Sequence, residues 1–198
     1  MTRPIVLGLT GSIGMGKSTT AAMFAAEGIP VWDADAAVHR LYAPGQAGAA
    51  AIGARYPAAI GVDGQVDRAR LRAMIADDPP VLNWLNAVIH PLTAADRARF
   101  LADHGGADIV LLDIPLLFET GADALCDAVL VVTAPPEVQR ARVLARGMGA
   151  AEFRLILARQ MPDAEKRARA DHVIETISTD QTRAAVRALL QNLRASHA

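Results

Sequence analysis

Eight residues near the start of the chain, GSIGMGKS at 11–18, fit the pattern G-x-x-x-x-G-K-[ST]. In loops of this kind, glycines let successive backbone N–H groups point at one phosphate, and the next helix directs its positive end at the same group. An apolar run at 4–10 precedes the pattern and a helical segment at 17–27 follows it. A chance glycine-rich turn would lack this context, so we predict a binding site for the phosphates of ATP or GTP.

The last residues of this loop have the side chains that nucleotide chemistry requires. The Lys17 ammonium can reach the terminal phosphates, and the Ser18 hydroxyl can ligate Mg²⁺. We therefore expect a nucleotide and Mg²⁺ as ligands. The residues predicted to bind the nucleotide in this loop are Gly11, Gly14, Met15, Gly16, Lys17, Ser18 and Thr19.

The rest of the chain alternates short apolar runs with helical patterns, which predicts an α/β fold with a parallel sheet covered on both faces. Residues 36–104 are expected to be mostly helical, with breaks at Pro44-Gly45, Tyr56-Pro57, the GVDGQ turn and Pro79-Pro80. An arginine-rich segment follows the expected helix at 136–146. The strands are expected at 4–10, 31–35, 108–115, 127–135 and 172–175, and the closing amphipathic helix at 178–195.

Length and composition narrow the classes of protein. A chain of 198 residues, 52% hydrophobic and 21% charged, suits one folded domain. A formal charge of −1 gives no basic surface for nucleic acid, and no apolar stretch approaches the ~18 residues of a membrane span. Cys126 is the only cysteine, so an intrachain disulfide is impossible and the cytoplasm is the expected compartment. No obligatory protein partner is evident.

Three classes of protein use such a phosphate loop. A GTPase switch needs a DxxG element and an N-K-x-D guanine reader, and neither stands at a suitable place. A mechanical or nucleic-acid ATPase would usually be larger and have a basic face. A small-molecule kinase needs an acceptor pocket, an acid near the acceptor hydroxyl, and arginines that close over the phosphates. The chain has candidates for all three parts, so we predict a kinase; a nucleotide-dependent switch without phosphotransfer is the alternative from another class.

Acidic residues end two of the expected strands, where ligands gather in open parallel sheets. Asp33 can accept the proton of an attacking hydroxyl, and Asp113 can hold Mg²⁺ directly or through water. Each has a structural alternative. Asp33 or, more readily, Asp35 can cap a helix starting at Ala36, and Asp113 can cap the turn at Pro115.

Arginines suit phosphate binding because the planar guanidinium donates two parallel hydrogen bonds. The candidates are Arg140, Arg142, Arg146, Arg154 and Arg159, with Lys166 beyond them. Arg142 and Arg146 are favoured because a spacing of four places them on one helix face. His90 precedes Pro91, which predicts an extended backbone at a helix break, where a structural role is the common one.

Beyond the loop, the chain resembles the dephospho-CoA kinase family over nearly its whole length. The motifs that carry the resemblance are LTGSIGMGKST at 9–19, WDAD at 32–35, WLNAVIHP at 84–91, DIPLLFE at 113–119, RVLAR at 142–146 and RQMPDAEKRARAD at 159–171. The resemblance implies a three-layer P-loop kinase fold with a five-stranded parallel sheet flanked by helices. It implies one domain with its core at 1–35, 105–146 and 171–198, a helical CoA-binding region at about 36–104 and a lid at about 147–170.

The function that the resemblance implies is the last step of coenzyme A synthesis. The ATP γ-phosphate would pass to the ribose 3′-hydroxyl of the small-molecule substrate dephospho-CoA, giving CoA and ADP. Asp33 is then the expected base, Lys17 and Arg142 the other catalytic residues, and Ser18 with Asp113 the Mg²⁺ ligands. The residues matched to the nucleotide contacts of the lid are Arg142 and Arg146, and those matched to dephospho-CoA binding are Asp33, His90, Leu116, Leu117 and Phe118. A kinase for a nucleoside monophosphate or a small hydroxylated metabolite is the nearest alternative.

The chain departs from the pattern of the family in three places. Ser12 and Met15 stand where GGIGSGKS is usual, and no acidic residue follows Arg146 in ARGMGAAEF. Many members have Asn-Gly near the adenine, whereas this chain has VIETIS at 173–178. Thr176, in this last segment, is not among the predicted site residues.

Overall fold

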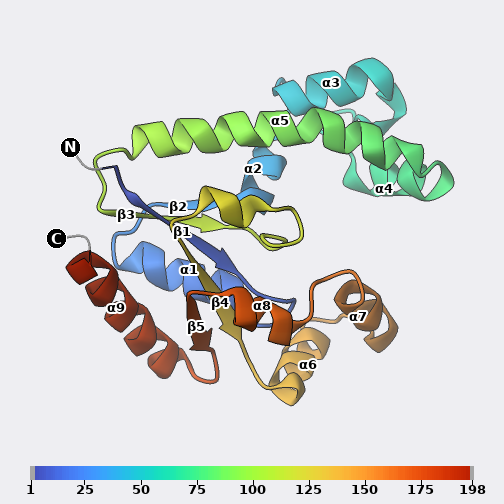
Figure 1. Ribbon diagram of the computed structural model, residues 1–198. Helices are drawn as coiled ribbons and strands as arrows, with labels where there is room; N and C mark the ends of the chain where they lie inside the picture. Colours follow the sequence, from blue (N-terminus) through green and yellow to red (C-terminus); the bar gives the residue numbers. More distant parts are fainter. Residues whose placement is uncertain (1–2, 197–198) are drawn as a thin grey trace. The chain divides into compact units, whose positions relative to one another are not determined.

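The computed structural model describes residues 3–196 and contains a five-stranded sheet in the order β2-β3-β1-β4-β5 (Figure 1). β1 pairs in parallel with both β3 and β4, and β4 pairs in parallel with β5. The predicted α/β fold with a parallel sheet flanked by helices is confirmed. The strands are β1 (Ile5–Thr10), β2 (Val31–Asp33), β3 (Ile109–Asp113), β4 (Ala128–Thr133) and β5 (His172–Glu175).

The chain divides into two compact units, and the second comprises Asp33–Asp103. The first unit, formed by the rest of the chain, holds the sheet and the helical segments α1 (Lys17–Ala26), η2 (Ala122–Leu125), α6 (Pro136–Ala145), α7 (Ala150–Leu157), α8 (Asp163–Arg169) and α9 (Thr179–Ser196). The second unit holds α2 (Ala34–Leu41), α3 (Ala47–Arg55), η1 (Pro57–Ala59), α4 (Arg68–Asp77) and α5 (Pro80–Asp103).

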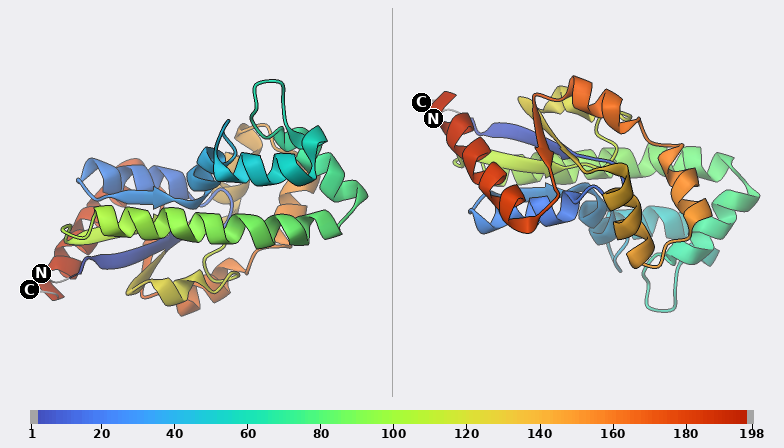
Figure 2. Two further views of the ribbon diagram at one scale, coloured as in Figure 1. Left: turned by 90° about the horizontal axis from the view of Figure 1, so that it is seen from above. Right: turned by 90° about the horizontal axis from the view of Figure 1, so that it is seen from below.

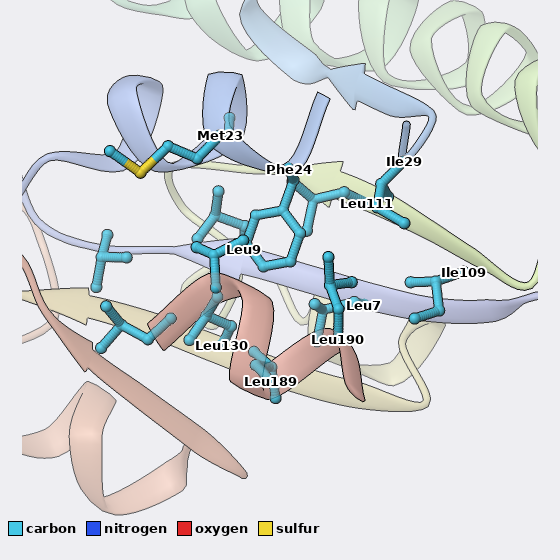
Figure 3. Packing of buried hydrophobic residues seen from close by; sticks show 14 of the residues in the cluster. Leu7, Leu9, Met23, Phe24, Ile29, Ile109, Leu111, Leu130, Leu189 and Leu190 are labelled. Atoms are coloured by element: carbon cyan, nitrogen blue, oxygen red, sulfur yellow. The ribbon is translucent and has the colours of Figure 1, made fainter. Parts of the chain in front are cut away.

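The main hydrophobic core lies along the central strand β1, whose six residues are all buried (Figure 3). Leu7 and Leu9 project to the side covered by α1 and α9, where they share a core with Phe24 and Leu190. A strand covered on both faces needs no alternation of polar residues, which explains its continuous apolar run. On the other side of β1, Gly8 leaves room for the segment after β3.

The close approach at Gly8 shows how that second face is covered. A Cβ atom at Gly8 would lie 2.6 Å from the Sγ of Cys126 and 3.1 Å from the Cδ2 of Leu117. Both neighbours belong to the chain between β3 and β4, so this segment packs directly on the strand that leads into the phosphate loop. Cys126 is itself partly buried.

The second unit has its own core, to which α5 contributes Leu85 and Ile89. α5 is one continuous helix of 24 residues (Figure 2). The prediction of an extended backbone and a helix break at His90 is therefore wrong, because His90 and Pro91 both lie inside this helix. Proline removes the backbone hydrogen bond to the carbonyl of Ala87, and Ala87 lies on the exposed side of the helix.

The strand expected at 31–35 ends at Asp33, and α2 begins at Ala34. The Oδ1 atom of Asp33 accepts a hydrogen bond of 3.0 Å from the N–H of Ala36, so Asp33 is the N-cap of α2. Asp35, the favoured cap in the sequence, lies in the first turn of the helix instead. The other predicted breaks of the helical region are at Pro44-Gly45, Tyr56-Pro57, the GVDGQ turn and Pro79-Pro80. They fall between helices or at the start of one, since Pro57 is the first residue of η1 and Pro80 the first residue of α5. Among the helices of residues 3–196, none has the length and apolar character to span a membrane.

Candidate nucleotide-binding site

The loop between β1 and α1 has the backbone conformation that its glycines predict. Gly14 and Gly16 have φ values of 79° and 88°, in the left-handed region that other residues rarely adopt. Gly16 is the N-cap of α1, so the helix starts directly after the loop. The loop and the positive end of α1 together form the kind of backbone cradle that binds phosphate.

Close packing against β4 and α6 also requires glycine at two positions of the loop. A Cβ atom at Gly11 would lie 2.6 Å from the carbonyl oxygen of Val132 in β4, and one at Gly14 would lie 2.6 Å from the Cγ2 of Val143 in α6. A larger residue at either position would displace the loop from β4 or α6. The sequence predicted a role for these glycines in phosphate binding. The structure adds a second role, which is close packing against β4 and α6.

The lysine of the loop forms an ion pair with the acid at the end of β3. The Nζ atom of Lys17 lies 2.7 Å from the Oδ1 atom of Asp113. The Asp113 side chain is 2% exposed and the Lys17 side chain 15% exposed. This pair joins the start of α1 to the neighbouring strand. The sequence suggested that Asp113 could instead cap the turn at Pro115. That alternative role does not account for the ion pair with Lys17.

Two glutamines, which sequence reasoning missed, hold the middle of the loop. Gln139 in α6 donates a hydrogen bond of 2.7 Å from Nε2 to the carbonyl oxygen of Ile13. The Oε1 atom of Gln160, between α7 and α8, accepts one of 3.1 Å from the N–H of Ile13. Gln160 belongs to the RQMP segment, one of the motifs that carry the family resemblance. The sequence therefore pointed to this residue, but it did not reveal its contact with Ile13.

The other predicted loop residues differ in how their side chains are placed. Ser18 and Thr19 are exposed in the first turn of α1, so their hydroxyls are accessible from solvent. Met15 is buried, and its sulfur accepts a hydrogen bond of 3.0 Å from the N–H of Ala134. The side chain of Met15 therefore belongs to the core, and its backbone is the part available to a ligand.

A cavity of about 380 Å³ opens beside the loop, within the range of small-molecule sites. Its lining includes Gly16, Thr19, Arg142, Arg146, Thr176 and Thr179, all from the first unit. The cavity is thus bounded by the start of α1, the end of α6 and the chain that follows β5. Its position next to the phosphate loop makes it the candidate site for the rest of a nucleotide.

Of the five candidate arginines, Arg142 and Arg146 line this cavity. Arg142 donates a hydrogen bond of 2.9 Å from Nη1 to the Oγ1 atom of Thr176, and its Nη2 donates to the carbonyl oxygen of the same residue. The other three candidates, Arg140, Arg154 and Arg159, are exposed. Two charged guanidinium groups in the lining of the cavity favour the binding of an anion.

Lys166 occupies a different environment from the other cations of the lid segment. Its side chain is 0% exposed, and its Nζ lies 2.8 Å from the Oε1 of Glu119. The same carboxylate atom accepts a hydrogen bond of 2.8 Å from the N–H of Met161. Lys166 therefore fastens α8 to the segment after β3, and in this conformation it is not available to a phosphate.

The segment at 113–119 contains the three residues matched to acceptor binding, and they are not equivalent. Leu116 is 40% exposed, whereas Leu117 and Phe118 are buried. The guanidinium carbon of Arg169 lies 4.4 Å from the ring centroid of Phe118, a cation–π contact between α8 and this segment. Leu116 alone offers a large apolar surface to a ligand without rearrangement.

Asp33 and His90 belong to the second unit. Asp33 uses Oδ1 to cap α2, and His90 is exposed on α5. Within residues 3–196, no group of three or more histidine, cysteine, aspartate or glutamate side chains is arranged to hold a metal ion. A metal site here would therefore depend on few protein ligands.

Gly16→Ala tests the close contact at the loop. A Cβ atom there would lie 2.8 Å from the Oγ1 atom of Thr176, and φ is 88°. Gly28→Ala is the matched control, because Gly28 has a φ of 81° but nothing within 4 Å of its Cβ position. Both variants should lose about 1 kcal/mol of unfolding free energy from backbone strain. Calorimetric titration with ADP should show at least a tenfold loss of affinity for Gly16→Ala alone; equal affinities would contradict the role of this contact.

Glu119→Gln tests the ion pair with Lys166 through its pH dependence. Burial, the largest single effect, raises the pKa of Glu119. The hydrogen bonds from Lys166, from Met161 and from the backbone N–H of Glu119, together with the charge of Lys166, outweigh burial and leave the pKa below the ordinary 4.5. A lowered pKa contributes stability above the unfolded-state value, and this contribution is lost as pH falls through the folded-state pKa.

Urea unfolding at pH 7 should therefore show Glu119→Gln less stable than the unmodified chain by about 1–3 kcal/mol. The difference should shrink as the pH is lowered below 4.5. Glu165→Gln, at an exposed position of α8, is the control and should differ little at either pH. A difference for Glu119→Gln that stays constant with pH would count against the ion pair.

Comparison with known proteins places this geometry in a family. Residues 5–181 match the family of dephospho-CoA kinases. A dephospho-CoA kinase from Cereibacter sphaeroides is 64% identical over 193 residues, which cover 97% of this chain and 97% of that protein. A crystal structure from Thermus thermophilus superposes with a TM-score of 0.85 at 36% identity, covering 97% of this chain and 99% of the other.

A dephospho-CoA kinase from Campylobacter jejuni, 22% identical, has a TM-score of 0.73 with 98% of each chain covered, which supports the fold. The family match and the high identity extend well beyond the phosphate loop and include the segments that form the cavity. This chain belongs to the dephospho-CoA kinase family and is an ATP-dependent kinase.

Proposed function

We propose that this chain transfers the γ-phosphate of ATP to the ribose 3′-hydroxyl of dephospho-CoA, giving CoA and ADP. The observation that carries the proposal is the phosphate loop with its lysine paired to Asp113 beside an open cavity. The family of the chain supplies the acceptor. The cytoplasm, where a single cysteine stays reduced, is the proposed compartment, and neither nucleic acid nor a membrane is a proposed partner.

The nucleotide phosphates bind the backbone of the loop at 11–18, and the base and ribose enter the cavity. Lys17 then exchanges its contact with Asp113 for one with the phosphates, because a phosphate brings more negative charge than one carboxylate. Arg142 and Arg146, which line the cavity, neutralise charge that develops on the transferred group. Since phosphoryl transfer requires little covalent chemistry from the protein, positioning and charge neutralisation supply most of the rate.

Ser18 and Asp113 are the proposed protein ligands of Mg²⁺. An exposed hydroxyl at the start of α1 and a carboxylate at the end of β3 are oxygen donors of the kind that Mg²⁺ prefers. Mg²⁺ in such sites takes only one or two protein ligands together with phosphate oxygens and water, so a small donor set is sufficient. When bound, the ion neutralises charge on the transferring phosphate.

Asp33 is the proposed general base. It ends a strand of the same sheet as the phosphate loop, at the carboxyl end where ligands of open α/β sheets bind. Capping of α2 involves Oδ1 and leaves the carboxylate a second oxygen for the acceptor hydroxyl. Its two roles are compatible, because the hydrogen bond to Ala36 fixes the orientation of the carboxylate.

His90 on α5 is proposed to bind dephospho-CoA through its exposed imidazole. Leu116 is proposed to contact the same substrate through its exposed side chain. Leu117 and Phe118 are buried, so a direct contact with the substrate would require movement of the segment. We therefore propose direct contact with dephospho-CoA for His90 and Leu116 only.

The acceptor is tested by ADP release from purified protein with Mg·ATP. Dephospho-CoA alone should raise the rate strongly, while AMP, adenosine and shikimate should leave it near the background of ATP hydrolysis. A rise with another acceptor but none with dephospho-CoA would contradict the proposed substrate and retain a kinase. Slow release independent of any acceptor would instead indicate a nucleotide switch.

Asp33→Asn tests the base without removing the helix cap, because an asparagine side chain can also accept the hydrogen bond from Ala36. We expect kcat to fall by about 10²–10⁴-fold with little change in melting temperature. Asp67→Asn is the matched control: Asp67 caps α4 by accepting from Ala69 and Arg70. The control should keep its turnover within about twofold, and a near-normal rate for Asp33→Asn would remove Asp33 as the base.

A further inference from the structure

Thr176, the residue directly after β5, connects three parts of the candidate site. It is 5% exposed, although it lines the cavity. Its N–H donates a hydrogen bond of 2.8 Å to the carbonyl oxygen of Thr133, which anchors it to the end of β4. Its own carbonyl oxygen and its hydroxyl both face Arg142.

The hydroxyl of Thr176 is engaged as both donor and acceptor. Its Oγ1 atom lies 2.8 Å from the carbonyl oxygen of Met15 and 3.2 Å from that of Thr133. A hydroxyl donates one hydrogen at a time, and the shorter contact favours Met15, in the phosphate loop. The same oxygen accepts the hydrogen bond from Nη1 of Arg142. With its proton directed to a carbonyl, this hydroxyl has no donor left for a nucleotide base.

Arg142 is held at two points by this one residue. One guanidinium nitrogen donates to the hydroxyl of Thr176 and the other to its carbonyl oxygen, so the guanidinium plane is fixed before a nucleotide binds. The side chain of Thr176 also packs against Gly16, where a Cβ atom would meet its Oγ1 at 2.8 Å and its Cβ at 3.1 Å. Thr176 therefore contacts both Arg142 in the lining of the cavity and Gly16 at the end of the phosphate loop.

We propose that Thr176 is a positioning residue for nucleotide binding: its hydroxyl holds the guanidinium of Arg142 and the Met15 carbonyl of the phosphate loop in the arrangement that receives ATP. The proposal rests on the proposed function only in that the cavity receives the nucleotide. Holding these groups in place lowers the conformational cost of binding, because less freedom is lost when the ligand arrives. The effect should therefore appear in the binding of the nucleotide and be absent from the binding of the acceptor.

Thr176→Val removes the hydroxyl and keeps the shape of the side chain, and Thr176→Ser keeps the hydroxyl and removes the methyl group. We expect Thr176→Val to weaken ADP binding, measured by calorimetry, by about tenfold, comparable to the loss of one or two hydrogen bonds. KM for ATP should rise similarly, while KM for dephospho-CoA stays within about twofold. Thr176→Ser should restore ADP affinity to within about threefold of the unmodified chain. Normal ADP binding by Thr176→Val, or a loss in Thr176→Ser as large as that in Thr176→Val, would overturn the proposal, because the hydroxyl would then not account for the effect.

A double-mutant cycle shows whether Thr176 acts through Arg142. Thr176→Val should weaken ADP binding much less in an Arg142→Ala background, because the guanidinium that it positions is absent. The same loss in both backgrounds would overturn the coupling to Arg142. The melting temperature of each variant identifies a variant that fails to fold, in which case Thr176→Ala replaces Thr176→Val, or Arg142→Lys replaces Arg142→Ala, in the cycle.

ADP affinity separates this proposal from the proposed function. If the unmodified chain bound ADP but did not phosphorylate dephospho-CoA, the acceptor assignment would fail while the affinity series could still support Thr176. If phosphorylation of dephospho-CoA proceeded and Thr176→Val bound ADP normally, the positioning role would fail and the proposed function would stand.

Discussion

The ion pair between Lys17 and Asp113 is the interaction on which the site depends. It links the helix after β1 to the end of β3, at the centre of a sheet in which these two strands are neighbours. Removing one partner of a buried pair costs about 3–5 kcal/mol, because the other charge is left without compensation. The nucleotide can replace Asp113 as the partner of Lys17, since its phosphates bring the compensating charge. The same contact thus stabilises the protein without ligand and prepares the lysine for binding.

The shape of the phosphate loop is determined by the surrounding fold as much as by its glycines. Val132 of β4 and Val143 of α6 lie against Gly11 and Gly14, and Thr176 lies against Gly16. Two glutamines hold Ile13 from α6 and from the segment between α7 and α8. β4, α6, the segment between α7 and α8 and the residue after β5 therefore all contribute to its conformation. A change in α6 or after β5 can alter nucleotide binding without contact with the ligand.

The sequence predicted the features of this molecule that depend on a local pattern of residues. Continuous apolar runs identified the buried strands, and the spacing of glycines, Lys17 and Ser18 identified the loop. Predictions failed where tertiary packing outweighed local preference. His90 lies in a helix because Leu85 and Ile89 on the same helix are buried in the second core, and Asp33 rather than Asp35 caps α2 because the strand ends two residues early. The roles of Thr176 and Gln139 depend on partners more than 30 residues away, which one sequence does not reveal.

The product of the reaction provides the decisive test. The chain is incubated with Mg·ATP and dephospho-CoA, and the ³¹P NMR spectrum of the product is recorded. We predict a new phosphomonoester on the ribose 3′-oxygen, formed in equal amount to ADP. Phosphate at another position of dephospho-CoA, or inorganic phosphate in place of a phosphorylated acceptor, would contradict this prediction.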